Sequence, residues 1–391
     1  MIGAEEERVR GGDLDRVRRG NLAEVLGLVH RAGALSRAEI TRATGLSRST
    51  VGGLIAQLAG LGLVTESEPG PGPRVGRPSP VVRPDPGCAA LAVNPELDAV
   101  TVGLVHLGGE IGPRVRHEVG HPVTAAEAVE IVVGALEPLA GDRRVLGVGI
   151  AVPGLVREAD GVVRWAPHLG WREEPIAAEV RRATGVPASA ANDASLGALA
   201  EHLFGAGAGL RDLVYLNGGA SGIGGGIIAN GAPLGGIGGY AGEFGRNRAA
   251  VADPDDRAVP GGALEDEVSR ARLLALLGAE SADPGELTAL LERSADPAVR
   301  AELARQARVL AVAVAGVINV LDPEAVVLGG FLADVLRADP AGFRDRVRAE
   351  AVAASAEGVR IVPAALGPDL LLAGAGQLAL RHVLTDPTAA A

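Results

Sequence analysis

Apolar residues near the start of the chain recur every three or four positions, the period of an amphipathic helix. The clearest case is residues 21–33, where Gly33 is a typical helix end. The buried face of this helix is expected to consist of Leu22, Val25, Leu26 and Val29. Residues 1–20 precede this pattern and are expected to form a flexible N-terminus.

Two further helices are predicted directly after the first, joined by a tight turn. Ser36 and Glu39 have the spacing of a capping box, so the second helix is expected over residues 37–44. Gly45 supplies the turn, and the third helix is expected over residues 48–61. Two helices joined by a short turn with glycine form the helix-turn-helix pattern, whose second helix enters the major groove of DNA.

The start of the third helix carries side chains suited to reading DNA. N-terminal positions of a recognition helix reach base edges, and arginine can bind guanine through two hydrogen bonds. A basic wing is expected over residues 63–84, as a strand, a turn and a return strand. Its extended, basic residues 76–78 suit a minor groove or a row of phosphates. The predicted DNA-contacting residues are Arg37, Ser47, Arg48, Ser49 and Thr50, with Arg74 and Arg77 in the wing.

The charge distribution agrees with this interpretation. Residues 1–87 hold twelve arginines and ten acidic residues, whereas the whole chain has a formal net charge of −11. Basic residues therefore concentrate in the part expected to contact double-stranded operator DNA. The alternative is a solvated three-helix module that binds another protein.

Composition limits the possible protein classes. The chain has 391 residues, of which 47% are hydrophobic and 2% are aromatic, so aliphatic side chains must fill its core. The single cysteine, Cys88, excludes an intramolecular disulfide and a multi-cysteine metal cluster, and we expect it to be a core residue. The longest apolar run, residues 309–321, is shorter than the ~20 residues of a membrane span. The N-terminus lacks the apolar stretch of a signal peptide. We therefore expect a cytoplasmic protein with no membrane partner.

After a proline-rich stretch that ends near Pro86, short apolar strands alternate with helices, which predicts an α/β fold. Strands are expected at residues 89–93, 99–106, 145–152, 188–191, 213–216, 226–228 and 325–328, and those at 213–216 and 226–228 are expected to pair. Helices are expected at residues 125–140, 173–184, 194–204 and in the long segment before Asn319.

Seven motifs occur in this part of the chain. They are GVGIAVPGLV (147–156), PHLGW (167–171), ANDASLGALAEHLFGAG (191–207), ASGIGGGIIANG (220–231), GYAGEFG (239–245), INVLDPEAVVLGG (318–330) and ALGPDLLLAGAG (365–376). In order and spacing they resemble the ROK family of repressors, open reading frames and sugar kinases. The resemblance implies an actin/hexokinase-like two-lobed α/β domain over residues 87–385, which also dimerises. It is preceded by an all-α winged helix-turn-helix domain over residues 21–86, as in the repressors of the family.

The resemblance also implies a sugar site between the two lobes. Asn192 and Asp193 match a sugar ligand and the catalytic base of the kinases, although both residue types also serve as helix N-caps. Glu243 and Glu265 match sugar ligands, and outside this context they would be exposed acidic residues. The expected sugar-binding set is Gly154, His168, Asn192, Asp193, Glu243, Arg246 and Glu265.

One departure from the family concerns ATP. The kinases of the family carry an Asp-x-Gly-Gly-Thr phosphate loop, whereas this chain has Asn94-Pro95-Glu96-Leu97-Asp98. Proline lacks an N–H group, and two acidic side chains repel phosphate. The second glycine-rich loop, residues 222–226, is retained. We expect no ATP cofactor, no catalytic residues and no useful kinase activity.

A second departure concerns metal. Many relatives hold zinc with a histidine and a cysteine-rich run, but Arg246 stands at the histidine position and Ala263 at the last cysteine position. Residues 247–263 contain neither cysteine nor histidine, so no zinc site of this kind can form. We expect Arg246 to pair with a nearby carboxylate instead.

These observations favour a sugar-responsive transcriptional regulator, expected to repress genes of xylose or other sugar catabolism. It is expected to bind its operator as a homodimer or tetramer, with a sugar or sugar phosphate as effector. The alternatives are an ATP-dependent, glucokinase-like sugar kinase and a regulator whose sugar domain serves only in dimerisation. The effector sugar, the operator, the regulated genes and the sign of the response stay open.

Overall fold

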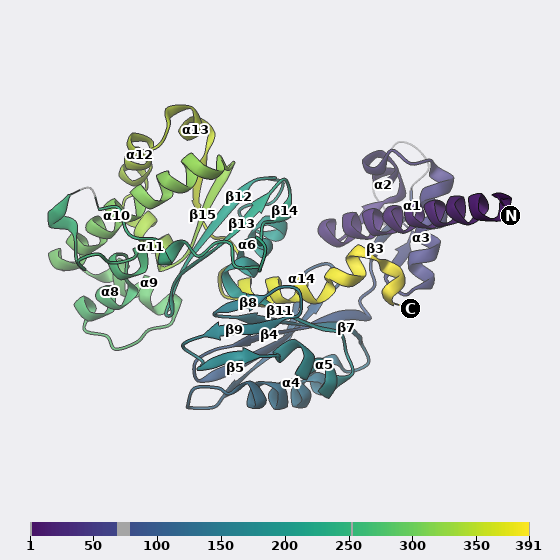
Figure 1. The fold of residues 1–391 in the computed structure, drawn as a ribbon, viewed down its shortest axis with the longest axis horizontal. Helices are drawn as coiled ribbons and strands as arrows, with labels where there is room; N and C mark the ends of the chain where they lie inside the picture. Colours follow the sequence, from purple (N-terminus) through teal and green to yellow (C-terminus); the bar gives the residue numbers. More distant parts are fainter. Residues whose placement is uncertain (1, 69–78, 252, 391) are drawn as a thin grey trace. The chain divides into compact units, whose positions relative to one another are not determined.

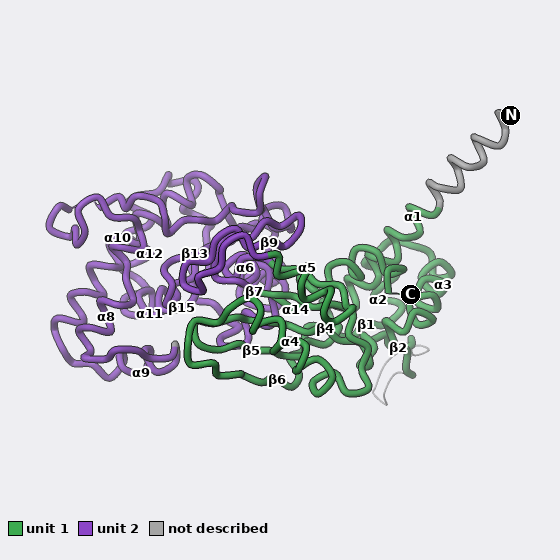
Figure 2. The backbone as a smooth tube through the Cα atoms, turned by 60° about the horizontal axis from the view of Figure 1, so that its bottom comes forward, with its two compact units in different colours: residues 1–150, 175–190, 375–391 green, residues 151–174, 191–374 purple. Residues whose placement is uncertain are grey.

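The computed structural model describes residues 2–68, 79–251 and 253–390. Contacts divide the chain into two compact units, coloured separately in Figure 2. Unit 1 comprises Met1–Ile150, Pro175–Ala190 and Ala375–Ala391. Unit 2 comprises Ala151–Glu174 and Ala191–Gly374.

The N-terminal head of unit 1 has the expected helices. Its elements are α1 (Ile2–Ala32), β1 (Leu35–Ser36), α2 (Arg37–Thr44), α3 (Arg48–Gly60), β2 (Val64–Ser67) and β3 (Val81–Pro84) (Figure 1). The capping box at Ser36 and Glu39 is present, and Gly45 adopts a φ of 68° in the turn. A small sheet with the order β1-β3-β2 completes the winged helix.

Helix α1 is longer than the sequence pattern predicts. In the structure α1 starts at Ile2, and the flexibility that we expected of residues 1–20 stays a prediction. The sequence between Ile2 and Ala32 contains no proline, so the hydrogen-bond ladder can continue towards the N-terminus.

The head shares its hydrophobic core with the rest of unit 1. Leu22, Val25, Leu26 and Val29 are fully buried as predicted, in one cluster with Leu380 of α14 (Leu370–Thr385). Cys88 belongs to the same cluster, as expected of a core residue. These contacts group the head with the sheet of unit 1, and the domain boundary that we placed at residue 86 stays a prediction.

A buried histidine reinforces this junction. Gly108 donates its backbone N–H to His30 Nδ1 at 2.9 Å. The other ring nitrogen, Nε2, therefore carries the proton and donates to Gln377 Oε1 at 2.8 Å. Burial lowers the pKa of His30, so its ring stays neutral near pH 7.

A five-stranded sheet with the order β11-β7-β4-β5-β6 forms the body of unit 1. Its strands are β4 (Cys88–Pro95), β5 (Ala99–His106), β6 (Ile111–Glu118), β7 (Arg144–Val152) and β11 (Ala188–Asn192), and the helices beside it are α4 (Ala125–Ala140) and α5 (Ile176–Thr184). The sequence pattern did not predict β6. The prediction of a helix from Glu173 was wrong at its start. Pro175 disfavours a helical conformation at the residue before it, so α5 begins at Ile176.

Unit 2 is built on a second five-stranded sheet with the order β14-β13-β12-β15-β16. Its strands are β12 (Leu213–Gly219), β13 (Gly222–Ala229), β14 (Ala232–Pro233), β15 (Ala325–Gly330) and β16 (Arg360–Pro363). The predicted pairing is confirmed, because Val214 lies opposite Ile227 in an antiparallel ladder. A small sheet, which was not predicted, contains β8 (Leu155–Arg157), β9 (Val162–Ala166) and β10 (Trp171–Glu174).

Helices pack around the sheet of unit 2 (Figure 1). They are α6 (Asp193–Phe204), α7 (Leu264–Glu267), α8 (Arg270–Leu277), α9 (Pro284–Arg293), α10 (Pro297–Leu321), α11 (Phe331–Ala338), α12 (Pro340–Glu350) and α13 (Ala353–Gly358), with short 3-10 turns at η1 (Phe244–Arg246), η2 (Pro254–Asp256) and η3 (Gly367–Asp369). By length and composition α10 could cross a membrane, but 56% of its most apolar window is buried inside the protein. Its apolar residues, among them Leu310 and Val314, belong to the core of unit 2.

Candidate functional site

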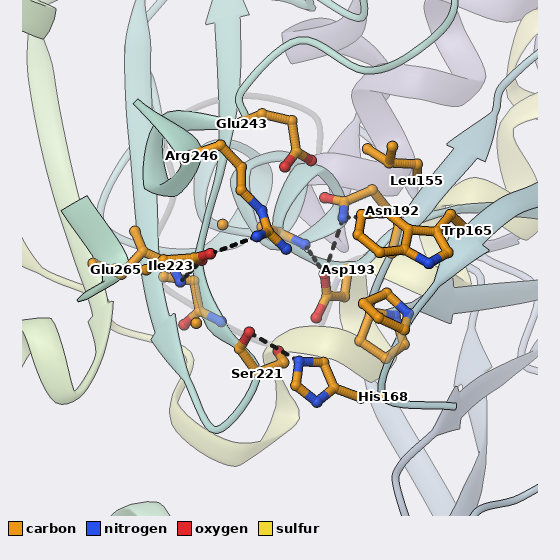
Figure 3. Close-up of a pocket in the computed structure, with 17 residues that line it drawn as sticks. Leu155, Trp165, His168, Asn192, Asp193, Ser221, Ile223, Glu243, Arg246 and Glu265 are labelled. Atoms are coloured by element: carbon orange, nitrogen blue, oxygen red, sulfur yellow. Dashed lines mark hydrogen bonds and ion pairs between the residues drawn. The ribbon is translucent and has the colours of Figure 1, made fainter. Parts of the chain in front are cut away.

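A cavity of about 320 Å³ opens in unit 2 and gathers all seven residues of the expected sugar-binding set (Figure 3). Its volume lies at the low end of the range for small-molecule sites. The 17 lining residues all belong to unit 2. They are Pro153, Gly154, Leu155, Trp165, Pro167, His168, Asn192, Asp193, Ala194, Asn217, Ser221, Gly222, Ile223, Gly224, Glu243, Arg246 and Glu265.

Asn192 combines the two roles that its sequence context allows. As the N-cap of α6, it accepts a hydrogen bond from Ser195 N at 2.9 Å through Oδ1. Its amide nitrogen also lines the cavity and donates to Gly154 O at 3.1 Å. A side chain at position 154 would collide with the neighbouring strand, because a Cβ there would lie 2.5 Å from Trp165 O. The turn at Gly154 and the start of α6 are therefore fixed to each other.

Asp193 lies next to Asn192 at the first position of α6. Its Oδ1 accepts hydrogen bonds from Ala194 N at 2.8 Å and from Asn192 Nδ2 at 3.2 Å. Burial raises the pKa of Asp193 to about 6, and the negative charge of Glu243 acts in the same direction. The pKa of Glu243 is also raised, chiefly by burial. The cavity thus holds a carboxylate that exchanges its proton near neutral pH and can accept a hydrogen bond from a ligand hydroxyl.

The expected pairing of Arg246 with a carboxylate is confirmed. Arg246 Nη1 lies 3.0 Å from Glu265 Oε1. The guanidinium carbon of Arg246 also lies 5.8 Å from the ring centroid of Trp165, within range of a cation–π interaction. Glu265 Oε2 accepts a hydrogen bond from Ile223 N at 3.2 Å. These contacts join η1, α7, β9 and β13 around one wall of the cavity (Figure 3).

The segment after Arg246 is held by a second, buried ion-pair network. Glu267 has no solvent exposure and accepts hydrogen bonds from Ala258 N at 2.8 Å and Val259 N at 3.0 Å. Arg305 of α10 reaches the same carboxylate at 3.1 Å. Within the described residues, no three histidine, cysteine or acidic side chains gather in a way that could hold a metal ion. The contacts of Glu267 fix the part of this segment around Ala258 and Val259, and the absence of a zinc site stays a prediction.

His168 lies at the rim of the cavity and is exposed. Its Nε2 donates to Ser221 O at 3.2 Å, which places the imidazole beside the β12–β13 turn (Figure 3).

Sequence reasoning missed part of the lining. Trp165 is 40% exposed although it is a large aromatic side chain, and it faces the cavity. Asn217 and Ser221 also line it. Aromatic residues are so rare in this chain that Trp165 could have been singled out by composition alone. Its strand, β9, was not predicted.

The predicted recognition helix has its N-terminus in solvent. Ser47 caps α3 by accepting from Thr50 N at 3.1 Å, and its hydroxyl also lies 2.8 Å from the hydroxyls of Ser49 and Thr50. Arg48 is exposed, and it forms no ion pair with the described part of the chain. On the opposite side of α3, the predicted core residues Val51, Leu54, Ile55 and Leu58 are buried.

The other predicted DNA contacts differ in their surroundings. Arg37 forms a two-pronged ion pair with Glu66 of β2, so its guanidinium is engaged within the head. The sequence could not indicate this pair, because the two residues are 29 positions apart. Arg74 and Arg77 lie outside the described residues.

Comparison with known proteins finds a family match for the N-terminal head and another for the larger part of the chain. The pattern of the ROK family matches residues 98–382, and that of the MarR family matches residues 23–74. A xylose repressor of Caldicellulosiruptor bescii is 26% identical over 318 residues, which cover 75% of this chain and 79% of the repressor. A glucokinase of Streptomyces coelicolor is 29% identical over 240 residues, which cover 56% of this chain and 74% of the kinase.

Among solved structures, a ROK family transcriptional regulator described as a homolog of the E. coli MLC protein superposes with a TM-score of 0.77. The superposition covers 95% of this chain and 98% of the regulator at 23% identity, so the fold is shared. The match to the ROK family covers residues 98–382, which is well over half of the chain, and leads to one conclusion. The chain belongs to the ROK family.

Proposed function

We propose that this protein is a sugar-responsive transcriptional repressor. One observation carries the proposal: a helix-turn-helix with an exposed arginine at the start of its recognition helix shares a chain with a carboxylate-lined cavity of about 320 Å³. An exposed recognition helix is needed to read DNA bases, and carboxylates that line a cavity can bind the hydroxyls of a ligand. The similarity to xylose repressors supports the same combination, and xylose is therefore the first sugar to test.

The DNA contacts are proposed to come from Arg48, Ser49 and Thr50, with Ser47 shaping the helix start. Arg37 would act indirectly, because its pairing with Glu66 fixes α2 against the wing. Arg74 and Arg77 remain proposed wing contacts from the sequence. One winged helix makes few base contacts, so a homodimer or a tetramer that reads paired half-sites in the cytoplasm is part of the proposal.

Mobility-shift titration on the DNA upstream of the gene tests this function directly. The protein is expected to retain that fragment at a salt concentration that releases random duplex, and the effector sugar is expected to release it. A ligand shifts such an equilibrium only by its differential affinity for the two forms of the protein. Equal binding of upstream and random DNA at moderate salt would refute the proposed function.

The residues at the lost phosphate loop support a non-enzymatic role. In the turn between β4 and β5, Glu96 accepts a hydrogen bond from Thr101 Oγ1 at 2.7 Å and pairs with Arg116 at 3.0 Å. Arg116 also lies 3.5 Å from Asp98. Arg116 offsets part of the repulsion that we expected from the two acids. The turn nevertheless lacks the glycines that let a backbone approach phosphate closely.

We expect the purified protein to consume no ATP with xylose, glucose or mannose at rates typical of kinases. A coupled assay of ADP release measures this, with a ROK glucokinase as the positive control. Sugar-dependent turnover in the range of about 1–100 s⁻¹ would establish the kinase alternative instead.

A further inference from the structure

The cavity has an unbalanced charge. Among the described residues that line it, Asp193, Glu243 and Glu265 are acidic, whereas Arg246 supplies the one guanidinium. With the three carboxylates ionised, the acidic groups and the guanidinium of the lining sum to two negative charges in excess. A ligand that carries a phosphate or a carboxylate would need a cationic group or free N–H donors in this cavity.

The guanidinium of Arg246 has an internal partner, although its side chain is 55% exposed. It pairs with Glu265 Oε1 at 3.0 Å, and it lies 5.8 Å from the ring centroid of Trp165. Trp165 and Glu265 come from different elements, β9 and α7, so the side chain is held from two sides (Figure 3).

One backbone donor of the glycine-rich hairpin is engaged as well. Ile223 N donates to Glu265 Oε2 at 3.2 Å, so a carboxylate of the protein occupies the position that an anion would take there. The packing is close, since a Cβ on Gly222 would lie 2.3 Å from the same oxygen. Glu265 thus uses one oxygen for the cation of the cavity and the other for a backbone donor.

We propose that Arg246 and Glu265 form a specificity clamp that restricts the cavity to an uncharged monosaccharide and excludes phosphorylated and acidic sugars. This inference rests on the proposed sugar-binding function and names the class of its effector. The exposed ring of Trp165 offers an apolar surface for the C–H face of the sugar, while Asp193 and Glu243 accept hydrogen bonds from its hydroxyls.

The clamp makes a gain-of-function test possible. Isothermal titration calorimetry would measure binding of D-xylose, D-glucose and D-mannose, and of glucose 6-phosphate, mannose 6-phosphate and D-glucuronate. In the wild type, the uncharged sugar that binds most tightly is expected to bind at least about tenfold more tightly than any of the three charged compounds. In Glu265→Gln, which frees Arg246 for an anion, this preference is expected to shrink to about threefold or less.

Two variants distinguish the effect of the Arg246–Glu265 pair on anion binding from the effect of the total charge of the cavity. Glu243→Gln removes one negative charge from the same cavity without freeing Arg246, and it is expected to keep most of the preference. The double variant Glu265→Gln, Arg246→Met is expected to lose the gained anion binding. Thermal melting of each variant shows that it is folded.

The outcomes of these titrations distinguish failure of the proposed clamp from failure of the proposed sugar-binding function. Wild-type binding of a charged compound as tight as that of the most tightly bound uncharged sugar would overturn the clamp and leave the proposed repressor standing. An equal loss of preference in Glu243→Gln and Glu265→Gln would also overturn it, in favour of general charge. Binding of none of the six compounds would contradict the sugar-binding function itself and the clamp with it.

Discussion

Asp193→Ala is expected to abolish the sugar response while operator binding stays intact. A hydrogen bond to a charged group contributes about 1.5–3 kcal/mol, so sugar affinity should fall roughly 10- to 150-fold. At a sugar concentration that just saturates the wild type, the variant should remain on DNA. Calorimetry with the effector and mobility shift on the operator measure the two properties separately.

Two controls sharpen this experiment. Asp193→Asn keeps the shape of the side chain and an oxygen that can accept from Ala194 N, so it isolates the effect of the ionised carboxylate. Asp160→Asn alters an exposed aspartate of the same unit, paired with Arg157, and should change sugar binding little. Loss of operator affinity together with the sugar response in Asp193→Ala would contradict the proposed division of labour.

The raised pKa of Asp193 adds a pH dependence. Because its pKa is about 6, the carboxylate is largely ionised at pH 7.5 and largely protonated at pH 5. The ionised form is the better acceptor for sugar hydroxyls, so sugar affinity should fall as the pH decreases through about 6. Calorimetry without DNA should show this decrease in the wild type and a weaker one in Asp193→Asn.

Arg48→Ala is expected to weaken specific operator binding by about 1–3 kcal/mol, which is roughly 5- to 150-fold. Arg48 is exposed at the start of α3, and no ion pair within the described chain restrains it, so its guanidinium is available for a base edge. Affinity for random duplex should fall much less, because a base contact contributes mainly to specificity.

The matched control removes the same charge elsewhere. Arg181 is an exposed arginine on α5, and Arg181→Ala should leave operator affinity within about twofold of the wild type. Calorimetric sugar binding should be unchanged in both variants. If Arg48→Ala lowered specific and random binding by the same factor, Arg48 would be a phosphate contact and not the base contact proposed here.

The sequence by itself determined the features that depend on neighbours along the chain. The capping residues Ser36 and Ser47 fixed the starts of α2 and α3, because a cap and the N–H groups it satisfies lie within three residues. Helical periodicity identified the buried faces of α1 and α3 for the same local reason. Motif order placed the seven sugar-site candidates, all of which line one cavity.

Only the tertiary structure decided which side chains are free. Arg37 pairs with Glu66, which is 29 positions away, so one predicted DNA contact is engaged within the head. Arg246 lies 5.8 Å from the ring centroid of Trp165, an aromatic residue of the cavity that was not predicted. The pKa of Asp193 likewise depends on burial and on Glu243, fifty positions away. Desolvation and Coulomb interaction act through distance in space, which the order of residues does not specify.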